Sequence, residues 1–207
     1  MGDAAVMLRW TGMGAGGDPL GIAATHRAIR GARISGVLDV VPAPASILVR
    51  FDPERVTEAE LRLRVLGFTS SRAGVRMPRN HKVMVRYGAG DGPDIEEVAA
   101  RLGLTVADVV KRHSAAVYTV LTTGFSPGFV YLGPLPAPLR LARRDEPRLS
   151  VPSGSVAIAG AQSGIYGARS GGGWWLIGRA ATSTFRPHRR PPTPFEIGDK
   201  VEFEAAR

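Results

Sequence analysis

Cysteine is absent from this chain of 207 residues, which excludes disulfides, thiolate metal ligands and a cysteine nucleophile. The sequence also lacks any run of about 18 apolar residues, and its first residues show neither the basic start nor the apolar core of a secretory signal. From these absences we expect no membrane span and no export signal. The lack of cysteine fits a cytoplasmic location.

Several catalytic and metal-binding motifs are missing as well. The chain holds no phosphate-binding loop of the G-x-x-x-x-G-K-[ST] type and no H-E-x-x-H pair. Its four histidines are far apart in the sequence, namely His26, His81, His113 and His188. Without a compact set of histidines or carboxylates, no metal site is predicted. Segments 153–155 and 162–164 only approach the G-x-S-x-G motif, which disfavours a serine nucleophile.

Acidic residues are in the minority. The chain has 27 Lys and Arg against 18 Asp and Glu, a formal net charge of +9, and only Lys82, Lys111 and Lys200 are lysines. Such an excess favours anionic partners on electrostatic grounds. The basic residues are scattered, with Arg143-Arg144 among the densest groups, and no nucleic-acid-binding module accompanies them. We therefore expect no nucleic-acid partner.

The N-terminal part of the sequence predicts a β-α-β-β-α order. The expected elements are a strand at 4–10, a helix at 18–30, strands at 37–41 and 46–51, and a helix at 57–67. Asp18 before Pro19 suits a helix start, and Thr57 and Glu60 have the spacing of a capping box. The short connection between the two central strands indicates antiparallel pairing. This order favours a small α/β domain of ferredoxin-like type, to which we assign residues 1–79.

The glycines before the first helix allow a second interpretation. Residues 12–17 match G-x-G-x-x-G between a strand and a helix, and Asp39 lies about where a ribose contact would be. A dinucleotide-binding fold needs the second strand to lead into another crossover helix, whereas here that strand turns straight back. A flexible turn is therefore the preferred interpretation.

Residues 70–79 lack either periodicity and indicate a linker. After them, the expected elements are a strand at 81–87, helices at 94–102 and 105–113, and strands at 116–123, 149–151, 155–159, 174–178, 182–185 and 200–204. Many short strands separated by regular turns favour a compact β-barrel. We assign residues 80–207 to this barrel, so the chain is predicted to be an α+β protein with two domains.

Three blocks rich in glycine and aromatic residues stand out at 124–133, 151–166 and 171–179. Glycine permits positive φ and close backbone approach, and aromatic rings supply rigid walls. This mixture fits a ligand pocket, and it equally fits tight β-turns alone. Trp174 and Trp175 are neighbours on an expected strand, so they should point to opposite faces and only one of them can serve a pocket.

The blocks GFSPGFVYLG, PRLSVPSGSVAIAGAQSGIY and GGGWWLIGR resemble the allophanate hydrolase subunit 1 family, also called the KipI or PxpB family. The resemblance spans roughly residues 1–207 and is strong from 81 to 179. It implies a small ferredoxin-like N-terminal domain and a cyclophilin-like β-barrel in the C-terminal part.

For function, the resemblance implies the B-type subunit of an ATP-dependent 5-oxoprolinase that opens 5-oxoproline to glutamate and is inactive alone. It also implies a PxpC-type partner, similar to allophanate hydrolase subunit 2, in a heterodimer or heterotetramer, and a PxpA-type third subunit. ATP would be bound by the complex rather than by this chain. Two alternatives stay open: the carboxyltransferase half of a biotin-dependent urea or amide carboxylase, and a regulator that inhibits a histidine kinase by binding it.

The candidate site residues fall into two groups. The expected polar catalytic groups are His113, Gln162, Tyr166 and Arg179. The expected substrate-binding residues are Phe125, Pro127, Gly128, Phe129, Tyr131, Gly164 and Trp174. Both Arg148 and Arg179 are able to hold a carboxylate or phosphate. A structural role is the alternative for His113 at a helix end and for Gln162 in a loop-tying hydrogen bond.

Overall fold

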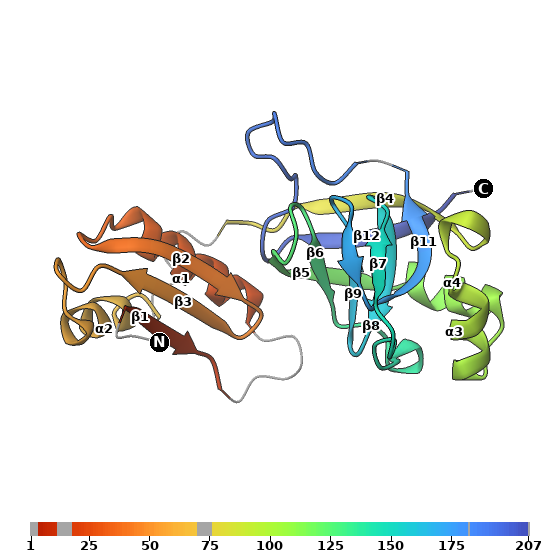
Figure 1. The fold of residues 1–207 in the computed structure, drawn as a ribbon, viewed down its shortest axis with the longest axis horizontal. Helices are drawn as coiled ribbons and strands as arrows, with labels where there is room; N and C mark the ends of the chain where they lie inside the picture. Colours follow the sequence, from red (N-terminus) through yellow and green to blue (C-terminus); the bar gives the residue numbers. More distant parts are fainter. Residues whose placement is uncertain (1–3, 12–17, 70–75, 182, 207) are drawn as a thin grey trace. The chain divides into compact units, whose positions relative to one another are not determined.

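The computed structural model describes residues 4–11, 18–69, 76–181 and 183–206. The chain forms two compact units, Met1–Met77 and Pro78–Arg207 (Figure 1). Among the described residues, no helix is long and apolar enough to cross a membrane. The glycines that match G-x-G-x-x-G, at 12–17, and residues 70–75 of the expected linker lie outside the described residues.

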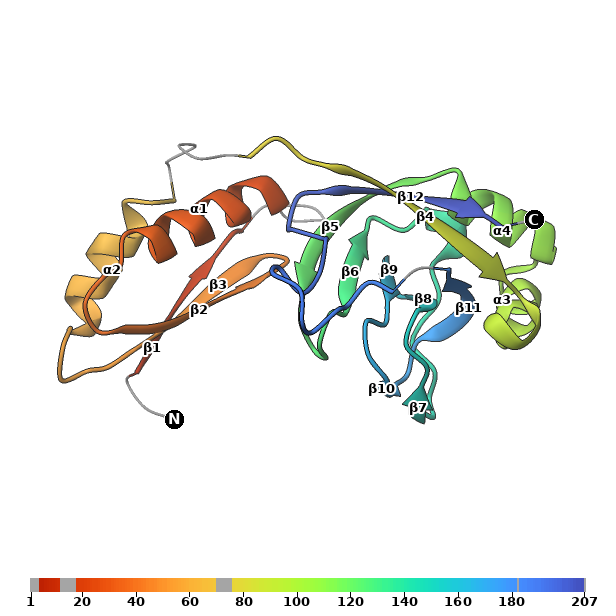
Figure 2. The ribbon, with the colours of Figure 1, turned by 90° about the horizontal axis from the view of Figure 1, so that it is seen from above.

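The N-terminal unit is an antiparallel sheet covered by two helices. Its elements are β1 (Ala5–Arg9), α1 (Pro19–Gly31), β2 (Val37–Ala43), β3 (Ser46–Phe51) and α2 (Glu58–Leu66). The strand order is β1-β3-β2, with β3 antiparallel to both neighbours. Both helices lie on one face of the sheet, as Figure 2 shows. The predicted β-α-β-β-α order is confirmed for the described residues, and it supplies five of the six elements of a ferredoxin-like unit.

Local sequence explains where the two helices begin. The Asp18 carboxylate accepts a hydrogen bond from the Gly21 N–H at 2.9 Å, and Pro19 takes the first helical turn, where no N–H donor is needed. At α2, the Thr57 hydroxyl accepts from the Glu60 N–H at 3.3 Å, while the Glu60 carboxylate accepts from the Thr57 N–H at 3.1 Å. Both predicted helix starts are therefore confirmed.

The C-terminal unit is a closed β-barrel. Its strands run in the order β11-β4-β12-β5-β6-β9-β8 around the barrel. They are β4 (Asn80–Tyr87), β5 (Val117–Thr123), β6 (Val130–Gly133), β8 (Ser155–Ala159), β9 (Gln162–Ile165), β11 (Trp175–Ala180) and β12 (Lys200–Ala205). Neighbouring strands are antiparallel except β4 and β12, which are parallel. The predicted β-barrel is confirmed, and the chain is an α+β protein.

Shorter elements flank the barrel. They are two 3-10 turns, η1 (Ala89–Asp91) and η2 (Ala137–Leu139), the helices α3 (Ile95–Leu102) and α4 (Val106–Ser114), and the strands β7 (Arg148–Val151) and β10 (Ser170–Gly172), which pair with each other. The two helices lie together at one end of the barrel, where α3 packs against β11 and α4 against β12 (Figure 1). Gly103 ends α3 with a φ of 65°, a left-handed conformation that glycine adopts without strain.

Strand predictions fail where side chains do not alternate in polarity. The strand expected at 182–185 is wrong for its described residues, because the Ser183 hydroxyl donates to the Phe185 carbonyl at 2.7 Å and this local bond takes the place of strand pairing. Conversely, the sequence pattern misses β6, β9 and β10. Nearly every residue of β6 and β9 is buried, so no alternation marks them, and β10 is a Ser-Gly-Gly segment with little strand propensity.

One buried carboxylate joins the first strand of the barrel to the last. Asp199 is fully buried and directly precedes β12. Its oxygens accept hydrogen bonds from the Arg79 N–H at 2.9 Å and the Glu196 N–H at 3.0 Å, and they lie 3.0 Å from His81 Nε2. Because Arg79 and His81 flank the first residue of β4, these bonds hold β4 in its parallel register with β12.

We predict that Asp199→Asn lowers the free energy of unfolding by about 1 to 3 kcal/mol, because an amide has one acceptor oxygen where the carboxylate has two. Urea denaturation of the full chain measures this loss. The exposed Asp145 offers a matched control, and Asp145→Asn should change stability by less than about 0.5 kcal/mol. Equal stability of the two variants would contradict the anchoring role of Asp199.

Candidate functional site

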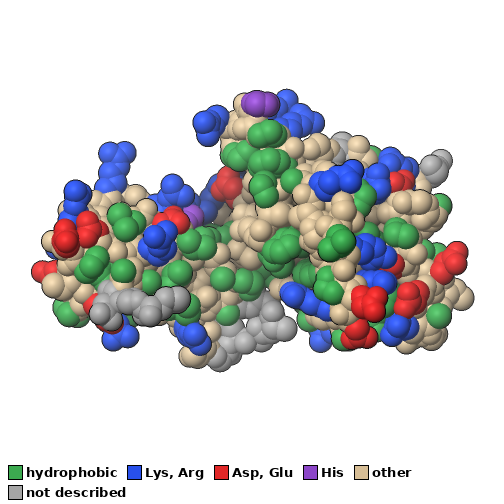
Figure 3. All heavy atoms as spheres, in the orientation of Figure 1, with side chains coloured by type: hydrophobic (Ala, Val, Ile, Leu, Met, Phe, Trp, Pro, Cys, Tyr) green, Lys and Arg blue, Asp and Glu red, His purple; other side chains and the backbone are tan. Residues whose placement is uncertain are grey.

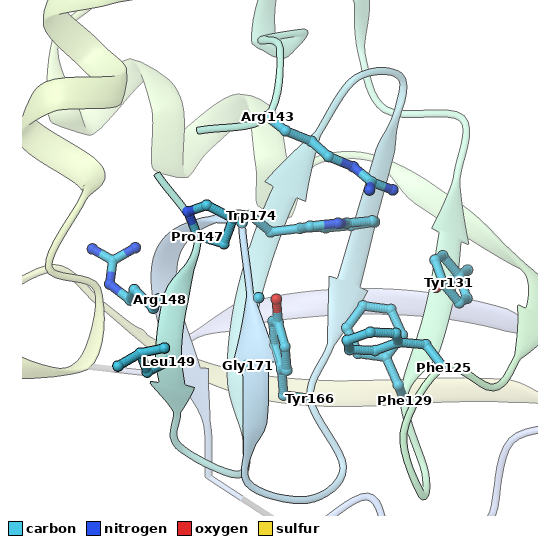
Figure 4. Close-up of a pocket in the computed structure, with 12 residues that line it drawn as sticks. Phe125, Phe129, Tyr131, Arg143, Pro147, Arg148, Leu149, Tyr166, Gly171 and Trp174 are labelled. Carbon is cyan, nitrogen blue, oxygen red and sulfur yellow. The ribbon is translucent and has the colours of Figure 1, made fainter. Parts of the chain in front are cut away.

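A pocket of about 480 Å³ in the C-terminal unit gathers residues from the glycine-rich blocks, and we call it the aromatic pocket. It is lined by Phe125, Phe129, Tyr131, Arg143, Pro147, Arg148, Leu149, Tyr166, Gly171, Gly172, Gly173 and Trp174. These residues come from the β5–β6 turn, β6, the segment leading into β7, the end of β9 and the β10–β11 connection. In Figure 4, Trp174 lies between Arg143 on one side and Tyr166 and Phe129 on the other.

Phe129 is the centre of the ring cluster. Its ring centroid lies 4.8 Å from that of Tyr166 at 89° and 5.5 Å from that of Trp174 at 82°. Tyr131 is tilted against it at 4.6 Å. Edge-to-face pairs place the positive edge of one ring against the negative face of another and add about 0.5 to 1.5 kcal/mol each beyond area burial. Phe129, Tyr166 and Trp174 are all buried, so the walls are packed before any ligand binds.

Glycine is required under these rings because a side chain would displace them. Gly164 lies in β9, and a Cβ built there would come 2.9 Å from Phe129 Cζ and 3.0 Å from Trp174 Cζ3. A Cβ on Gly172 would collide with the Tyr166 hydroxyl. The two glycines therefore seat the three walls, so the glycine-rich blocks serve tight packing and a pocket together.

The turn between β5 and β6 carries the exposed side of the pocket. It is closed by hydrogen bonds from the Gly124 N–H to the Phe129 carbonyl at 3.1 Å and from the Phe129 N–H to the Ser126 carbonyl at 3.0 Å. Phe125 has a φ of 70°, a conformation that costs a residue with a side chain about 1 to 2 kcal/mol. Its side chain is 68% exposed and meets Phe129 edge to face. The turn therefore holds a strained, exposed aromatic at the mouth of the pocket.

Three polar groups converge on the pocket. The Arg143 guanidinium carbon lies 5.9 Å from the centroid of the Trp174 ring, within cation–π range. Burial raises the pKa of Tyr166 to about 12, and it also raises the pKa of Tyr131, while the Arg143 charge lowers both pKa values. Both phenols are therefore neutral at pH 7 and offer O–H donors beside a cation.

Arg148 lines the pocket with its stem, whereas its charge is held elsewhere. Asp94 is buried, and its carboxylate accepts from the Leu176 N–H at 2.7 Å and from the guanidinium groups of Arg148 and Arg144. Figure 4 shows the Arg148 guanidinium directed away from Trp174. Asp94 thus fixes the segment that leads into β7 against the start of α3 and against β11.

The structure separates the predicted site residues into two sets. Five line the aromatic pocket, namely Phe125, Phe129, Tyr131, Tyr166 and Trp174. Gly164 lies under its rings, Gly128 belongs to the β5–β6 turn, and Pro127 lies on that turn without lining the pocket. Trp175 belongs instead to the barrel core, with its indole N–H bonded to the Ala142 carbonyl at 2.6 Å, so the expected opposite facing of the two tryptophans is confirmed.

Three of the four polar candidates lie outside the lining of the aromatic pocket. Arg179 places its Nε 3.1 Å from an Asp91 carboxylate oxygen, at η1. Gln162 is half-buried at the start of β9, where it pairs with Ala159 of β8. Neither residue contributes to the pocket lining, and His113 does not either, so only Tyr166 among the polar candidates reaches the pocket.

His113 is a neutral cross-link in the barrel core. It is fully buried, with Nδ1 2.8 Å from the Tyr87 hydroxyl and Nε2 2.9 Å from Ser163 Oγ. Ser163 Oγ donates to the Ala157 carbonyl at 3.2 Å, so it accepts from Nε2–H, and Nδ1 accepts from Tyr87. Burial lowers the pKa of His113 to about 3. The charged form that would favour the end of the helix dipole is therefore absent at pH 7.

Arg143, Pro147 and Leu149 are pocket residues that sequence reasoning missed. The pair Arg143-Arg144 is conspicuous in the sequence as a dense basic group, but nothing local shows that one arginine reaches a pocket and the other a carboxylate. Elsewhere the basic side chains are scattered over the visible face of each unit (Figure 3). Within the described part of the chain, no group of His, Asp and Glu residues is arranged to hold a metal ion.

A family model described as "Carboxyltransferase domain, subdomain C and D" matches residues 1–195. This chain belongs to that family. Curated relatives of the carboxyltransferase C and D domain that are named as the B-type subunit of 5-oxoprolinase are 48% identical over 122 residues in Escherichia coli O157:H7 and 43% identical over 122 residues in Bacillus subtilis (strain 168). The resemblance to the allophanate hydrolase subunit 1, KipI or PxpB family is thereby confirmed.

The alignments with these relatives are partial. They include 59% of this chain and 56% and 51% of the two relatives, so the chain spans about half the length of the curated relatives it matches. Among solved structures, TTHA0988 is 36% identical with a TM-score of 0.85, over 98% of this chain and 40% of that chain. Kluyveromyces lactis urea carboxylase has a TM-score of 0.73 over 100% of this chain and 21% of that chain, but at 16% identity it shows the carboxyltransferase domain fold alone.

We predict that stability falls in mild acid because of His113. Its pKa is about 3 when folded and 6.5 when unfolded, so the unfolded chain binds the proton and unfolding becomes easier as pH drops below about 6.5. The contribution is at most about 1.4 kcal/mol per pH unit. Urea denaturation between pH 4.5 and 7.5 should show a shallower slope for His113→Gln, and the exposed His188→Gln should keep the parent slope. Parallel slopes for all three proteins would contradict this assignment.

A second prediction concerns the glycine under the rings. Gly164→Ala should displace Phe129 and Trp174 and lower the free energy of unfolding by about 1 to 3 kcal/mol. Thermal unfolding and tryptophan fluorescence report the two effects. At Gly31 an added Cβ would meet nothing within 4 Å, so Gly31→Ala is the matched control and should be neutral or slightly stabilising. An unchanged emission spectrum and stability in Gly164→Ala would show that the rings do not rest on this glycine.

Proposed function

We propose that this chain acts as the B-type subunit of a 5-oxoprolinase complex that opens 5-oxoproline to glutamate. The observation that carries the proposal is the aromatic pocket, built from the sequence blocks by which the family was recognised. The names of the curated relatives, which are B-type subunits of 5-oxoprolinase, support the reaction. The resemblance to urea carboxylase rests on fold alone, and no feature of the described pocket lining favours biotin chemistry or kinase inhibition.

The pocket suits a small ring with few polar groups. Its volume of about 480 Å³ falls within the range of small-molecule sites. A five-membered lactam offers two flat faces to Phe129 and Trp174, and the Tyr131 and Tyr166 hydroxyls are placed to donate to its carbonyl or carboxylate oxygens. We therefore assign ring binding to the aromatic side chains and oxygen binding to the phenols.

The pocket alone does not hold the groups for lactam hydrolysis. Among the described residues that line it, none is Asp, Glu or His, so it offers no general base for water. We propose that a PxpC-type partner, similar to allophanate hydrolase subunit 2, supplies that base and covers the mouth, where Leu149 is 99% exposed and Phe125 also lines the pocket. A third, PxpA-type subunit would complete a heteromeric, cytoplasmic enzyme that is inactive without its partners.

ATP is assigned to the assembled complex rather than to this chain. A lactam carbonyl is a weak electrophile, and phosphoryl transfer from ATP to its oxygen would make the ring carbon open to water. Water addition, loss of phosphate and cleavage of the C–N bond would then yield glutamate, ADP and phosphate. The chain has no phosphate-binding loop, and the aromatic lining of the pocket does not suit a triphosphate.

We also propose the finer fold assignments that the family resemblance implies. The N-terminal β-α-β-β-α order supports a ferredoxin-like unit, and the closed barrel with two flanking helices supports a cyclophilin-like one. Among the predicted catalytic residues, we retain Tyr166 as a ligand contact. For His113, Gln162 and Arg179 we propose structural roles in the barrel, because none of them reaches the pocket.

The test is reconstitution with candidate PxpC-type and PxpA-type proteins, followed by assay of ADP and glutamate formed in the presence of 5-oxoproline. We expect Tyr166→Phe to lower kcat/KM about 3- to 10-fold, because one hydrogen bond to the substrate is lost. Tyr118→Phe removes a phenol that donates to the His113 carbonyl at 3.1 Å in the core, so it should keep kcat/KM. Absence of 5-oxoproline-dependent ADP release from the folded complex would refute the proposed function.

A further inference from the structure

The charged side chains at the aromatic pocket differ in how much of their charge is already neutralised. Arg148 shares the buried carboxylate of Asp94 with Arg144. Arg144 lies in addition 3.8 Å from a Glu97 carboxylate oxygen. Arg143 has no carboxylate at ion-pair distance among the described residues, although it is the arginine whose guanidinium lies over the Trp174 ring. Within the described lining, Arg143 is therefore the cation that is available to a ligand.

The surroundings of Arg143 are arranged for an anion. The described lining holds two arginines and no acidic residue. The Arg143 charge acts on both Tyr131 and Tyr166, since it lowers their pKa values against the effect of burial, and this places the three donors close together. In Figure 4 the Tyr166 hydroxyl is directed toward Trp174, and the Arg143 side chain extends along the opposite side of the same ring. A guanidinium flanked by phenol O–H groups fits a carboxylate.

We propose that Arg143 is the residue of the aromatic pocket that selects for a carboxylate on a small cyclic ligand. The identity of that ligand as 5-oxoproline rests on the proposed function above, whereas the carboxylate preference rests on the pocket alone. The aromatic rings bind the ring of the ligand, and Arg143 distinguishes a cyclic amide that carries a carboxylate from one that does not. Arginine suits this role because its planar fork can meet both carboxylate oxygens while stacked on an indole.

The experiment compares two probes, 5-oxoproline and 2-pyrrolidinone, which share the lactam ring and differ in the carboxylate. Binding to the full chain and to the reconstituted complex is followed by calorimetry and by tryptophan fluorescence. We expect the parent protein to bind 5-oxoproline about 10- to 100-fold more tightly than 2-pyrrolidinone, as charged hydrogen bonds allow. Arg143→Gln should abolish this preference and leave 2-pyrrolidinone binding within about twofold.

Two further variants complete the test. Arg143→Lys keeps the charge but loses the planar fork, so it should restore only part of the preference. Arg169→Gln removes the same charge from an exposed residue near β10 that bonds Ser150 and does not line the pocket, and it should bind both probes like the parent. In the active complex, Arg143→Gln should lower kcat/KM for 5-oxoproline by the same factor as the binding, with Arg169→Gln unchanged.

The outcomes separate this inference from the proposed function. If the complex turns over 5-oxoproline and Arg143→Gln behaves like Arg169→Gln, the function stands and the role of Arg143 is wrong. If no complex hydrolyses 5-oxoproline but the parent protein prefers it to 2-pyrrolidinone through Arg143, the function is wrong and the carboxylate site stands. Failure of both the chain and the complex to distinguish the two probes overturns the inference.

Discussion

The aromatic pocket depends on one contact, in which the Phe129 ring rests on the bare Cα of Gly164. Strand pairing creates this contact, since Gly164 of β9 lies opposite Tyr131 of β6 and Ala157 of β8. Trp174, which directly precedes β11, approaches the same glycine, so barrel closure and wall formation are a single packing event. A shift of one residue in the register of β9 would place Ser163 or Ile165 there and exclude both rings.

The aromatic half of the site could be predicted from sequence because its signal is local. Glycines next to Phe129, Tyr166 and Trp174 indicate both the tight turns and the rings that pack on them, and helix starts such as Asp18 are equally local. The charged half could not be predicted. Arg148 and Arg144 meet Asp94 across 54 and 50 residues of sequence, and only the folded barrel shows which arginine is left for a ligand.

His113 and Arg179 show a second limit of sequence reasoning. A histidine and an arginine near glycine-rich blocks have the chemistry of catalytic groups, but burial and partners decide whether that chemistry reaches a ligand. His113 is held neutral between Tyr87 and Ser163, and Arg179 is placed beside Asp91. Both residues stabilise the barrel that carries the pocket. Their residue types are informative about where polar groups meet, and uninformative about which meeting point faces solvent.

The parallel pairing of β4 with β12 has a consequence for how the C-terminal unit is made. β12 lies between β4 and β5, which precede it by most of the length of the unit. Until residues 200–205 leave the ribosome, β4 and β5 each keep an unpaired edge on the side that β12 will occupy. Synthesis of every other strand of the barrel leaves this gap open. The barrel therefore closes only once β12 has emerged, and a nascent chain that stalls before residue 200 carries two exposed strand edges prone to aggregation.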